Sequence, residues 1–373
     1  MAKNHLIGAI ATLVGTVIGA GILGIPYVVA KSGLLIGIIH IILIGLAVIL
    51  MNLYVGEIAL RTKGTHQLVG YAEKYTGKWG KWVMATSIFF GIYGALIAYL
   101  IGEGQSLNTL FGINQFAGMF VFFILMAYLI WRGLNIIEGA EIYLSAILGF
   151  LILALFFFAI IKINPLNLTP LNFSNVLLPY GVVFFALLGM AAIPELKEEL
   201  IKDKKQLKKA IIIGMLIPIV VYILFSIAII GITGFQTTEL ATIGLGALLG
   251  NHILILGNLF AIFSMATSFL TLGLALKWTF QYDYKYNKYL AWALTCLLPL
   301  SVALSNLTGF IQVIGISGSI AGGLGGLAII FIHRNAQKRG DRKPEYSLKP
   351  RFILDALLFL IFTGGIIYTI VTL

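Results

Sequence analysis

The sequence contains few charged residues. Only 10% of its 373 positions are Asp, Glu, Lys or Arg, whereas 60% are hydrophobic. Because a soluble domain carries about 25% charged residues, this chain lacks the side chains that would cover a water-facing surface. It also lacks the alternating segments of about ten residues that mark a membrane β-barrel. With a mean hydropathy of +1.02, the sequence predicts an all-α integral membrane protein.

Residues that could form disulfides, metal sites, catalytic centres or channel filters are scarce as well. The single cysteine, Cys296, lies within an apolar run, which excludes an intramolecular disulfide and a thiolate metal site. The five histidines are scattered and form no H-E-x-x-H pair, so a membrane enzyme of that kind lacks support. A channel lacks support too, because neither a filter-like repeat nor a ring of charges is visible. We therefore expect no enzyme, and no cofactor other than a coupling ion.

Hydrophobic runs account for most of the chain. Eleven of them are predicted to cross the bilayer as helices, because a helix needs about 20 residues to span it. The first run is too long for a signal-peptide core and lacks a clear cleavage site, so it counts as a span. The predicted spans cover residues 6–30, 33–57, 82–111, 116–133, 139–163, 178–196, 210–233, 251–277, 289–305, 308–333 and 352–372.

The distribution of lysine and arginine predicts the orientation of these spans. With the N-terminus in the cytoplasm, all of the 25 Lys and Arg residues except Lys31 and Lys162 lie on the cytoplasmic side. Basic residues concentrate on that side in membrane proteins. We therefore expect a multi-pass protein of the cell membrane with a cytoplasmic N-terminus and an external C-terminus. The same bias explains the net charge of +11, so no nucleic-acid partner is expected.

The stretch GTVIGAGILGIPY, residues 15–27, has two interpretations. It contains a G-x-G-x-x-G pattern, but a dinucleotide site needs a preceding strand and an acidic residue about 20 positions later, and residues 40–50 carry no acid. Four glycines followed by Pro26 are instead poorly suited to a continuous helix, and a broken helix inside a bilayer is tolerated where it lines a cavity. Close packing through Gly15 and Gly19 is the simpler alternative.

A second interruption is predicted five spans later. The sixth span contains LLPYGVVFFALLGMAAIPEL, with Gly189 in its middle and Pro194 just beyond. Transporters built from inverted repeats carry interrupted helices at corresponding places in their two halves. The first and sixth spans thus form a predicted pair of broken helices.

The segment GTVIGAGILGIPYVVAKSG, residues 15–33, resembles the first helix of the amino acid/auxin permease and tyrosine/tryptophan permease families, within the amino acid–polyamine–organocation superfamily. The resemblance implies the LeuT-type fold, in which two five-helix units form an inverted repeat. The first repeat would comprise residues 1–163 and the second residues 178–333. Residues 352–373 would add an eleventh helix.

The resemblance also implies a binding site for an amino acid at the two breaks. The N–H groups of Ala20 and Gly21, which follow Gly19, would hold the carboxylate, because the start of a half-helix is an anion site. Carbonyl groups of Ile18, Phe184 and Ala186 would accept hydrogen bonds from the ammonium group.

The side-chain end of the predicted site is apolar, which favours a neutral hydrophobic or aromatic substrate. Ordinary core packing is the alternative for each residue taken alone. The candidates are Phe184, Phe185, Leu188 and Met190 around the second break, with Tyr93 and Tyr99 on the third span.

Two coupling ions are considered. Ser264, Thr267 and Ser268 recur at a spacing that places three hydroxyls on one helical face, and resemblance to sodium-coupled LeuT-type transporters implies a Na+ site with carbonyls of Gly15 and Ile18. Alternatively, these hydroxyls bond carbonyls of their own helix. For a proton, Glu195 is the candidate, with a solvated helix end as its alternative, whereas Glu103 is expected near the external face.

Together these features predict a secondary active transporter that imports neutral hydrophobic or aromatic amino acids by Na+ or H+ symport with alternating access. The alternative is proton-coupled or exchange transport of another small organic substrate. Metal-ion transport is disfavoured, because transporters of that kind with this fold carry Asp and Asn in the first break and GAGILGIP has neither.

Overall fold

The computed structural model describes residues 2–133, 156–157, 162–168, 170–348 and 351–372. Within these ranges every extended regular element is a helix, in agreement with the all-α prediction. The α-helices are α1 (Ala2–Val17), α2 (Gly21–Ser32), α3 (Leu34–Arg61), α4 (Leu68–Phe111), α5 (Gln115–Arg132), α7 (Pro179–Leu187), α8 (Ile193–Glu199), α9 (Leu207–Thr233), α10 (Ala241–Leu249), α11 (Asn251–Trp278), α12 (Lys288–Leu304), α13 (Phe310–Ser317), α14 (Gly323–Arg339) and α15 (Phe352–Thr372).

Most predicted spans correspond to one helix or to a helix pair. In the described ranges, eight helical segments are long and apolar enough to cross a membrane, or nine if the bent pair α1 and α2 counts as one span. The 17-residue helix α12 is apolar but shorter. The predicted span 139–163 lies outside the described residues except for 156–157 and 162–163. The short helix α10 was not predicted.

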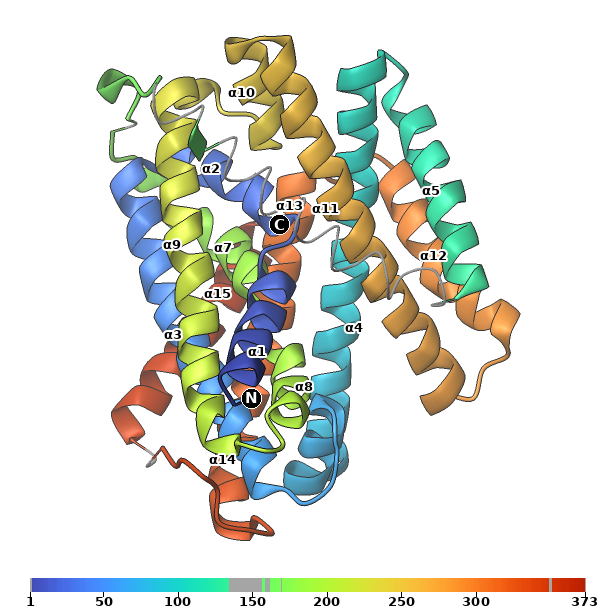
Figure 1. Ribbon diagram of the computed structural model, residues 1–373. Helices are drawn as coiled ribbons and strands as arrows, with labels where there is room; N and C mark the ends of the chain where they lie inside the picture. Colours follow the sequence, from blue (N-terminus) through green and yellow to red (C-terminus); the bar gives the residue numbers. More distant parts are fainter. Residues whose placement is uncertain (1, 134–155, 158–161, 169, 349–350, 373) are drawn as a thin grey trace.

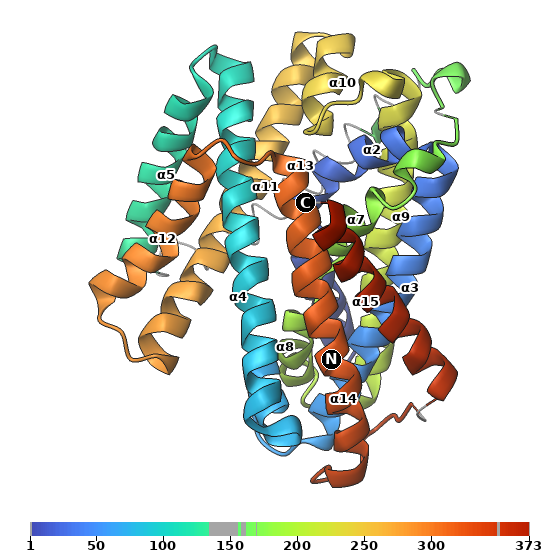
Figure 2. The same ribbon diagram turned by 180° about the vertical axis from the view of Figure 1, so that it is seen from behind.

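The helices form one bundle in which distant parts of the chain lie side by side (Figures 1 and 2). Helix α3 packs against α9, and α4 packs against α11, with α5 and α12 beyond them. Helices α7 and α13 lie in the interior between these groups, α1 packs on α9 and α8 with one side exposed, and α15 covers α14 from outside. The segments around residues 18–20 and 188–189 therefore meet inside the bundle rather than at its surface.

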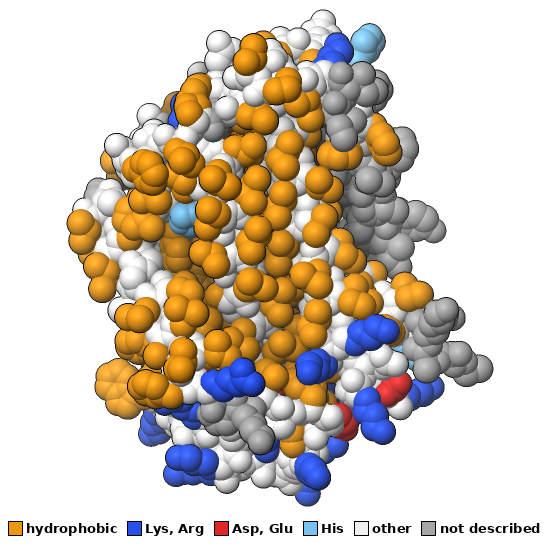
Figure 3. Space-filling view, turned by 90° about the vertical axis from the view of Figure 1, so that its left-hand side faces the viewer, with side chains coloured by type: hydrophobic (Ala, Val, Ile, Leu, Met, Phe, Trp, Pro, Cys, Tyr) orange, Lys and Arg blue, Asp and Glu red, His pale blue; other side chains and the backbone are white. Residues whose placement is uncertain are grey.

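The outer face of the bundle is suited to lipid. Figure 3 shows a continuous apolar surface on the side of α3 and α9, with lysine and arginine gathered at one end. Exposed Leu43 and Leu46 of α3, and Val220 and Leu224 of α9, belong to the apolar part of the surface. We call the charged end the basic end. It contains the end of α3, the start of α9 and the end of α14, with Arg61, Lys204, Lys205, Lys208, Lys209, Lys338, Arg339 and Arg342.

The chain leaves helical geometry at both predicted interruptions. Helix α1 ends at Val17 and α2 begins at Gly21, with a bend of 58° between them. Helix α7 ends at Leu187, after which Leu188 is extended (φ −64°, ψ 114°) and a short 3-10 helix (Met190–Ala192) leads into α8. A Cβ atom on Gly189 would lie 2.7 Å from Cγ2 of Val17, so glycine allows the second interruption to approach the end of α1.

Candidate functional site

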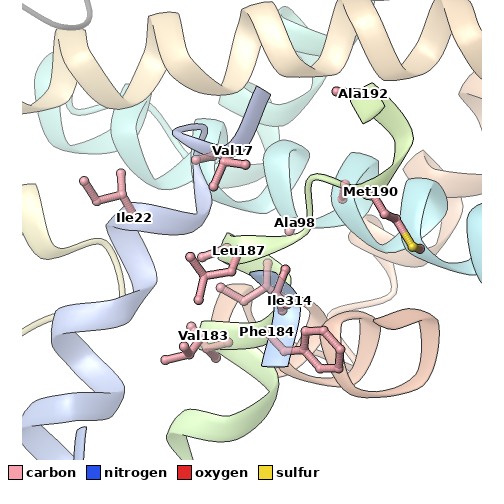
Figure 4. Close-up of a cluster of buried hydrophobic side chains, with 14 of the residues drawn as sticks. Val17, Ile22, Ala98, Val183, Phe184, Leu187, Met190, Ala192 and Ile314 are labelled. Atoms are coloured by element: carbon pink, nitrogen blue, oxygen red, sulfur yellow. The ribbon is translucent and has the colours of Figure 1, made fainter. Parts of the chain in front are cut away.

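The two interruptions face each other through Gly21 and Ala186. A Cβ atom on Gly21 would lie 2.7 Å from the Cα of Ala186 and 2.8 Å from its Cβ, closer than non-bonded carbons approach. Glycine is therefore needed for the start of α2 to lie against the end of α7. Figure 4 shows the surrounding side chains, with Val17 at the end of α1 and Leu187 beside it at the end of α7.

Two backbone donors at the first interruption are available for a ligand. The N–H groups of Ile22 and Leu23 donate to the carbonyls of Gly19 and Ala20, and that of Gly19 donates to Val17. In the described part of the chain, no such bond engages the N–H groups of Ala20 and Gly21. Unsatisfied N–H groups at a helix start attract anions.

Tyr222 of α9 connects the two interruptions. Its buried hydroxyl lies 2.7 Å from the carbonyl oxygen of Val17 and 3.0 Å from that of Ala186, so that its single hydrogen is shared between the two acceptors. Both carbonyls stand at helix ends, where the normal partner four residues later is missing. Tyr222 could not be identified from the sequence, because a single tyrosine in an apolar span has no spacing that indicates a partner.

Tyr99 and Ser268 approach the first interruption from the other side. Tyr99 is buried in α4, and its hydroxyl lies near the side chain of Ser268 of α11. A Cβ atom on Gly19 would lie 3.3 Å from the Oγ of Ser268. The hydroxyls of Tyr99, Ser268 and Tyr222 thus surround the bend between α1 and α2.

Tyr93, the other tyrosine predicted for the site, has a different environment. Its hydroxyl donates to the carbonyl of Leu294 in α12, at 3.2 Å. Six residues of α-helix rotate a side chain by about 600°, or 240° after one full turn, so Tyr93 and Tyr99 leave α4 in different directions. Their shared location on one span does not place them on one face.

The large side chains at the second interruption point into the core. The ring of Phe184 stacks on Phe362 of α15 at 5.5 Å between centroids. A Cβ atom on Gly325 of α14 would lie 2.7 Å from the Cε of Met190. In Figure 4 the side chains of Phe184 and Met190 point to one side of the chain and those of Val183 and Leu187 to the other. In this conformation Phe184 and Met190 contact α14 and α15.

Phe185 and Leu188 are only partly buried. A Cβ atom on Gly318 would lie 2.6 Å from the backbone nitrogen of Phe185, so this part of α7 lies directly against the π-helical turn Gly318–Gly322. Leu188 occupies the extended position that ends α7. The backbone of α7 at Phe185 is therefore in close contact with Gly318.

The predicted cation ligands supply only oxygen atoms. Thr267 bonds its own helix, with its hydroxyl 2.9 Å from the carbonyl of Phe263 and 3.0 Å from that of Ser264, as in the alternative interpretation. Ser264 is buried, and a Cβ atom on Gly15 would find no neighbour within 4 Å among the described residues. Three or more His, Cys, Asp or Glu side chains do not gather as metal ligands anywhere in the described ranges.

The proton candidate Glu195 lies in the first turn of α8 and is exposed. It lies in the part of the sixth predicted span that is nearer the basic end. Acidic side chains are stabilised at such a helix start by the helix dipole.

A separate cluster of polar side chains lies at the basic end, around Glu57. The fully buried carboxylate of Glu57 in α3 accepts hydrogen bonds from Nε of Arg61 (2.8 Å), Oγ of Ser347 (2.9 Å) and the backbone N–H of Leu348 (2.7 Å). Nε2 of His333 in α14 lies 3.0 Å from Oε2, the oxygen that also accepts from Leu348. Glu57 therefore ties the segment after α14 to α3.

Neighbouring pairs extend this cluster. The hydroxyl of Tyr54 and the Nε of Arg334 both donate to Asp355 of α15, each at 2.8 Å. Lys74 forms an ion pair with Asp341, and this hydrogen-bonded contact lowers the pKa of the Asp341 carboxyl below its usual range. The segment from α14 to α15 is thus held by side chains from α3 and α4.

The chain is similar in sequence to known amino acid transporters. The chain matches the tryptophan/tyrosine permease family over residues 2–372. It is 26% identical to glutamine transporter 2 of Aliivibrio fischeri over 334 residues, 84% of this chain and 85% of that protein. It is also 26% identical to tyrosine-specific transport system 1 of Haemophilus influenzae over 350 residues, 85% of this chain and 84% of that protein.

A solved structure shares the fold. The structure of MhsT in complex with L-phenylalanine matches with a TM-score of 0.67 at 18% sequence identity, covering 98% of this chain and 97% of that one. This likeness shows the LeuT-type fold that the first helix implied.

A multi-pass helical bundle of this fold, with such relatives, defines a transporter of amino acids rather than an enzyme. The chain belongs to the tryptophan/tyrosine permease family.

Proposed function

We propose that this protein imports neutral hydrophobic or aromatic amino acids by cation symport, binding them between the two interrupted helices. The observation that carries the proposal is the contact of Gly21 with Ala186. It brings the unengaged N–H groups of Ala20 and Gly21 next to the carbonyl end of α7. An α-amino carboxylate and its ammonium group need such a donor set and acceptor set a few ångströms apart.

In this proposal α1 and α2 form the broken first span of an eleven-span protein, and α7 with the 3-10 helix Met190–Ala192 and α8 forms its broken sixth span. Residues 1–163 and 178–333 form the inverted repeats, and residues 352–373 form the additional helix. The basic end faces the cytoplasm, because lysine and arginine concentrate on that side, so the N-terminus lies inside and the C-terminus outside the cell membrane.

The apolar surroundings support the substrate class. Burying a hydrophobic side chain contributes about 1.5–3 kcal/mol, whereas a polar group buried without a partner is costly. The residues proposed to shape this environment are Tyr93, Tyr99, Phe184, Phe185, Leu188 and Met190, with rotation of Phe184 or Met190 needed for direct contact. The glutamine transporter among the relatives makes a neutral polar side chain the second candidate.

For the coupling ion, sodium is proposed at the hydroxyls of Ser264, Thr267 and Ser268 with carbonyls of Gly15 and Ile18. An all-oxygen donor set suits a hard cation. Ser268 supports this arrangement because it lies against Gly19 and so close to the first interruption. A proton carried by Glu195 is the alternative, and exchange of another small organic substrate is a further one.

Uptake by proteoliposomes tests the proposal. Labelled leucine, phenylalanine, tyrosine and glutamine are supplied with a sodium gradient, with a pH gradient, or with neither. Accumulation driven by sodium, with Ser268→Ala requiring more sodium for half-maximal uptake, is expected. Thr271→Ala, which alters a more exposed hydroxyl bonded within the same helix at 3.0 Å, is the matched control. Glutamate or lysine competing better than every neutral amino acid would overturn the substrate class.

A further inference from the structure

Glu103 stands apart from the other buried acids of the described residues. Glu57 and Asp355 are also buried, and each accepts hydrogen bonds from at least two side chains. Glu103 has no exposed surface, and neither of its carboxyl oxygens has a hydrogen-bond partner in the described part of the chain. An ionisable side chain within a membrane bundle is a candidate for function.

The position of Glu103 relates it to the proposed amino acid site. Tyr99, Gly102 and Glu103 follow the i, i+3, i+4 spacing that gives one face of α4. This face is packed, since a Cβ atom on Gly102 would lie 2.6 Å from Sδ of Met265 and 3.3 Å from a ring carbon of Phe310. Glu103 therefore lies one helical turn beyond Tyr99, on the side away from the basic end.

Among the described residues, the helices around Glu103 provide no charge close to its carboxyl group. The helices packed on α4 near Glu103 are α5, α11 and α13, and α13 has no ionisable residue. Just before α13, a Cβ on Gly309 would lie 3.5 Å from Oε2 of Glu239. The titratable groups on α5 and α11 are Tyr128, Arg132, His252 and Lys277; Tyr128 is exposed, and the other three lie in the first or last turn of their helices.

Other buried oxygen atoms lack partners in the same half of the bundle. Ser106, one turn beyond Glu103 on the same face, is fully buried, and its hydroxyl has no partner among the described residues. Asn258 of α11 is also buried; within the same ranges its Oδ1 has no partner, while its amide nitrogen donates to Leu254. Neither residue donates a hydrogen bond to Glu103, so neither stabilises the ionised carboxylate.

We propose that Glu103 is a proton-binding site whose occupancy controls opening of the bundle away from the basic end; this rests on the transport cycle proposed above. In the conformation described here the carboxyl group is neutral. An ionised carboxylate without donors is far costlier to bury than a neutral acid, so ionisation requires water to reach the side chain. Closure around a substrate therefore takes up one proton from that side, and reopening there releases it.

Infrared spectroscopy and substrate binding test this directly. The purified protein in detergent is expected to show the C=O stretching band of a protonated carboxylic acid, and this band is absent from Glu103→Gln. Glutamine has nearly the same shape and cannot ionise, so the variant mimics the protonated state. The matched control Glu73→Gln alters an exposed ion-paired acid and retains the band.

Binding of labelled tyrosine or leucine measures the coupling. In the wild type and in Glu73→Gln, substrate affinity is expected to fall as the pH rises, by up to about tenfold per pH unit once Glu103 is ionised in the open state. Substrate binding then takes up a proton. In Glu103→Gln, affinity is independent of pH over the same range and no proton is taken up. Binding is measured only at pH values below the range in which the substrate's amino group titrates.

The outcomes separate the two proposals. If no amino acid binds to the wild type, the transport proposal fails while the infrared band still reports on Glu103. If the wild type shows the band but its substrate affinity depends on pH in the same way as that of Glu103→Gln, the inference is overturned. Glu103 would then be a permanently neutral structural acid. The inference is also overturned if the wild type lacks the band and its substrate affinity depends on sodium only while Glu103 is present. Glu103 would then belong to a cation site.

Discussion

At the scale of single residues, the site depends on contacts that leave no space for a side chain. Gly21 lies against the backbone of Ala186, and Tyr222 holds the carbonyls of Val17 and Ala186 with one hydroxyl. The first contact brings the two interruptions together, and the second fixes their spacing. A change at either residue should weaken substrate binding more than it disturbs the packing of the remaining bundle.

Gly21→Ala tests the first contact. The added Cβ atom would lie 2.7 Å from the Cα of Ala186, so the backbone must shift and the two free N–H groups lose their position. We expect amino acid binding to weaken at least tenfold, which corresponds to about 1.4 kcal/mol, as measured by binding of a labelled substrate. Gly8→Ala in α1 is the control, because its Cβ meets no described atom within 4 Å, and it should bind as the wild type does. Equal affinity of both variants would contradict the assignment.

Tyr222→Phe tests the second contact. Removing the hydroxyl leaves two buried carbonyls without this donor, at a cost of about 1–3 kcal/mol. We expect a lower melting temperature in detergent and weaker substrate binding. Tyr289→Phe changes an exposed tyrosine and should alter neither quantity. A Tyr222→Phe variant as stable and as active as the wild type would show that the two ends are held by other contacts.

At the scale of helices, the sequence predicted the interruptions but not the directions of side chains. Four glycines and Pro26 are visible in the sequence, and they coincide with the 58° bend. The orientation of Phe184 toward Phe362 depends on how α7 packs on α15, about 180 residues away, and no local pattern encodes it. The burial of Glu103 was equally hidden, because distance along a helix gives depth in the bilayer and not the neighbours on each face.

The Glu57 cluster gives a prediction at the same scale. Replacing Glu57 by Gln removes the charge that accepts bonds from Arg61, Ser347 and Leu348. Breaking a buried charged network costs about 3 kcal/mol, so the contact between α3 and the segment before α15 should loosen. A thermal melt in detergent measures the change. Glu73→Gln, whose exposed pair with Lys81 contributes about 0–1 kcal/mol, should melt as the wild type does, and equal melting of both variants would contradict this role.

At the scale of the whole molecule, composition and charge were enough to predict a helical membrane protein, and the first helix was enough to predict its family. The family model spans residues 2–372 and the fold of a solved transporter covers 98% of the chain. The contacts of Tyr222 and Glu57 could not be predicted, because their partners come from distant helices. The sequence therefore encodes the bundle through local periodicity, whereas the site arises from pairs that only the folded bundle brings together.

The central claim is that the broken first helix holds the carboxylate of an amino acid with the N–H groups of Ala20 and Gly21. Equilibrium binding to the purified protein tests it most directly, with tyrosine, phenylalanine and leucine compared with their methyl esters. The esters keep the side chain and the amino group but lose the negative charge. We expect the free amino acids to bind and the esters to bind at least tenfold more weakly. Esters that bind as tightly as the free amino acids would contradict the claim.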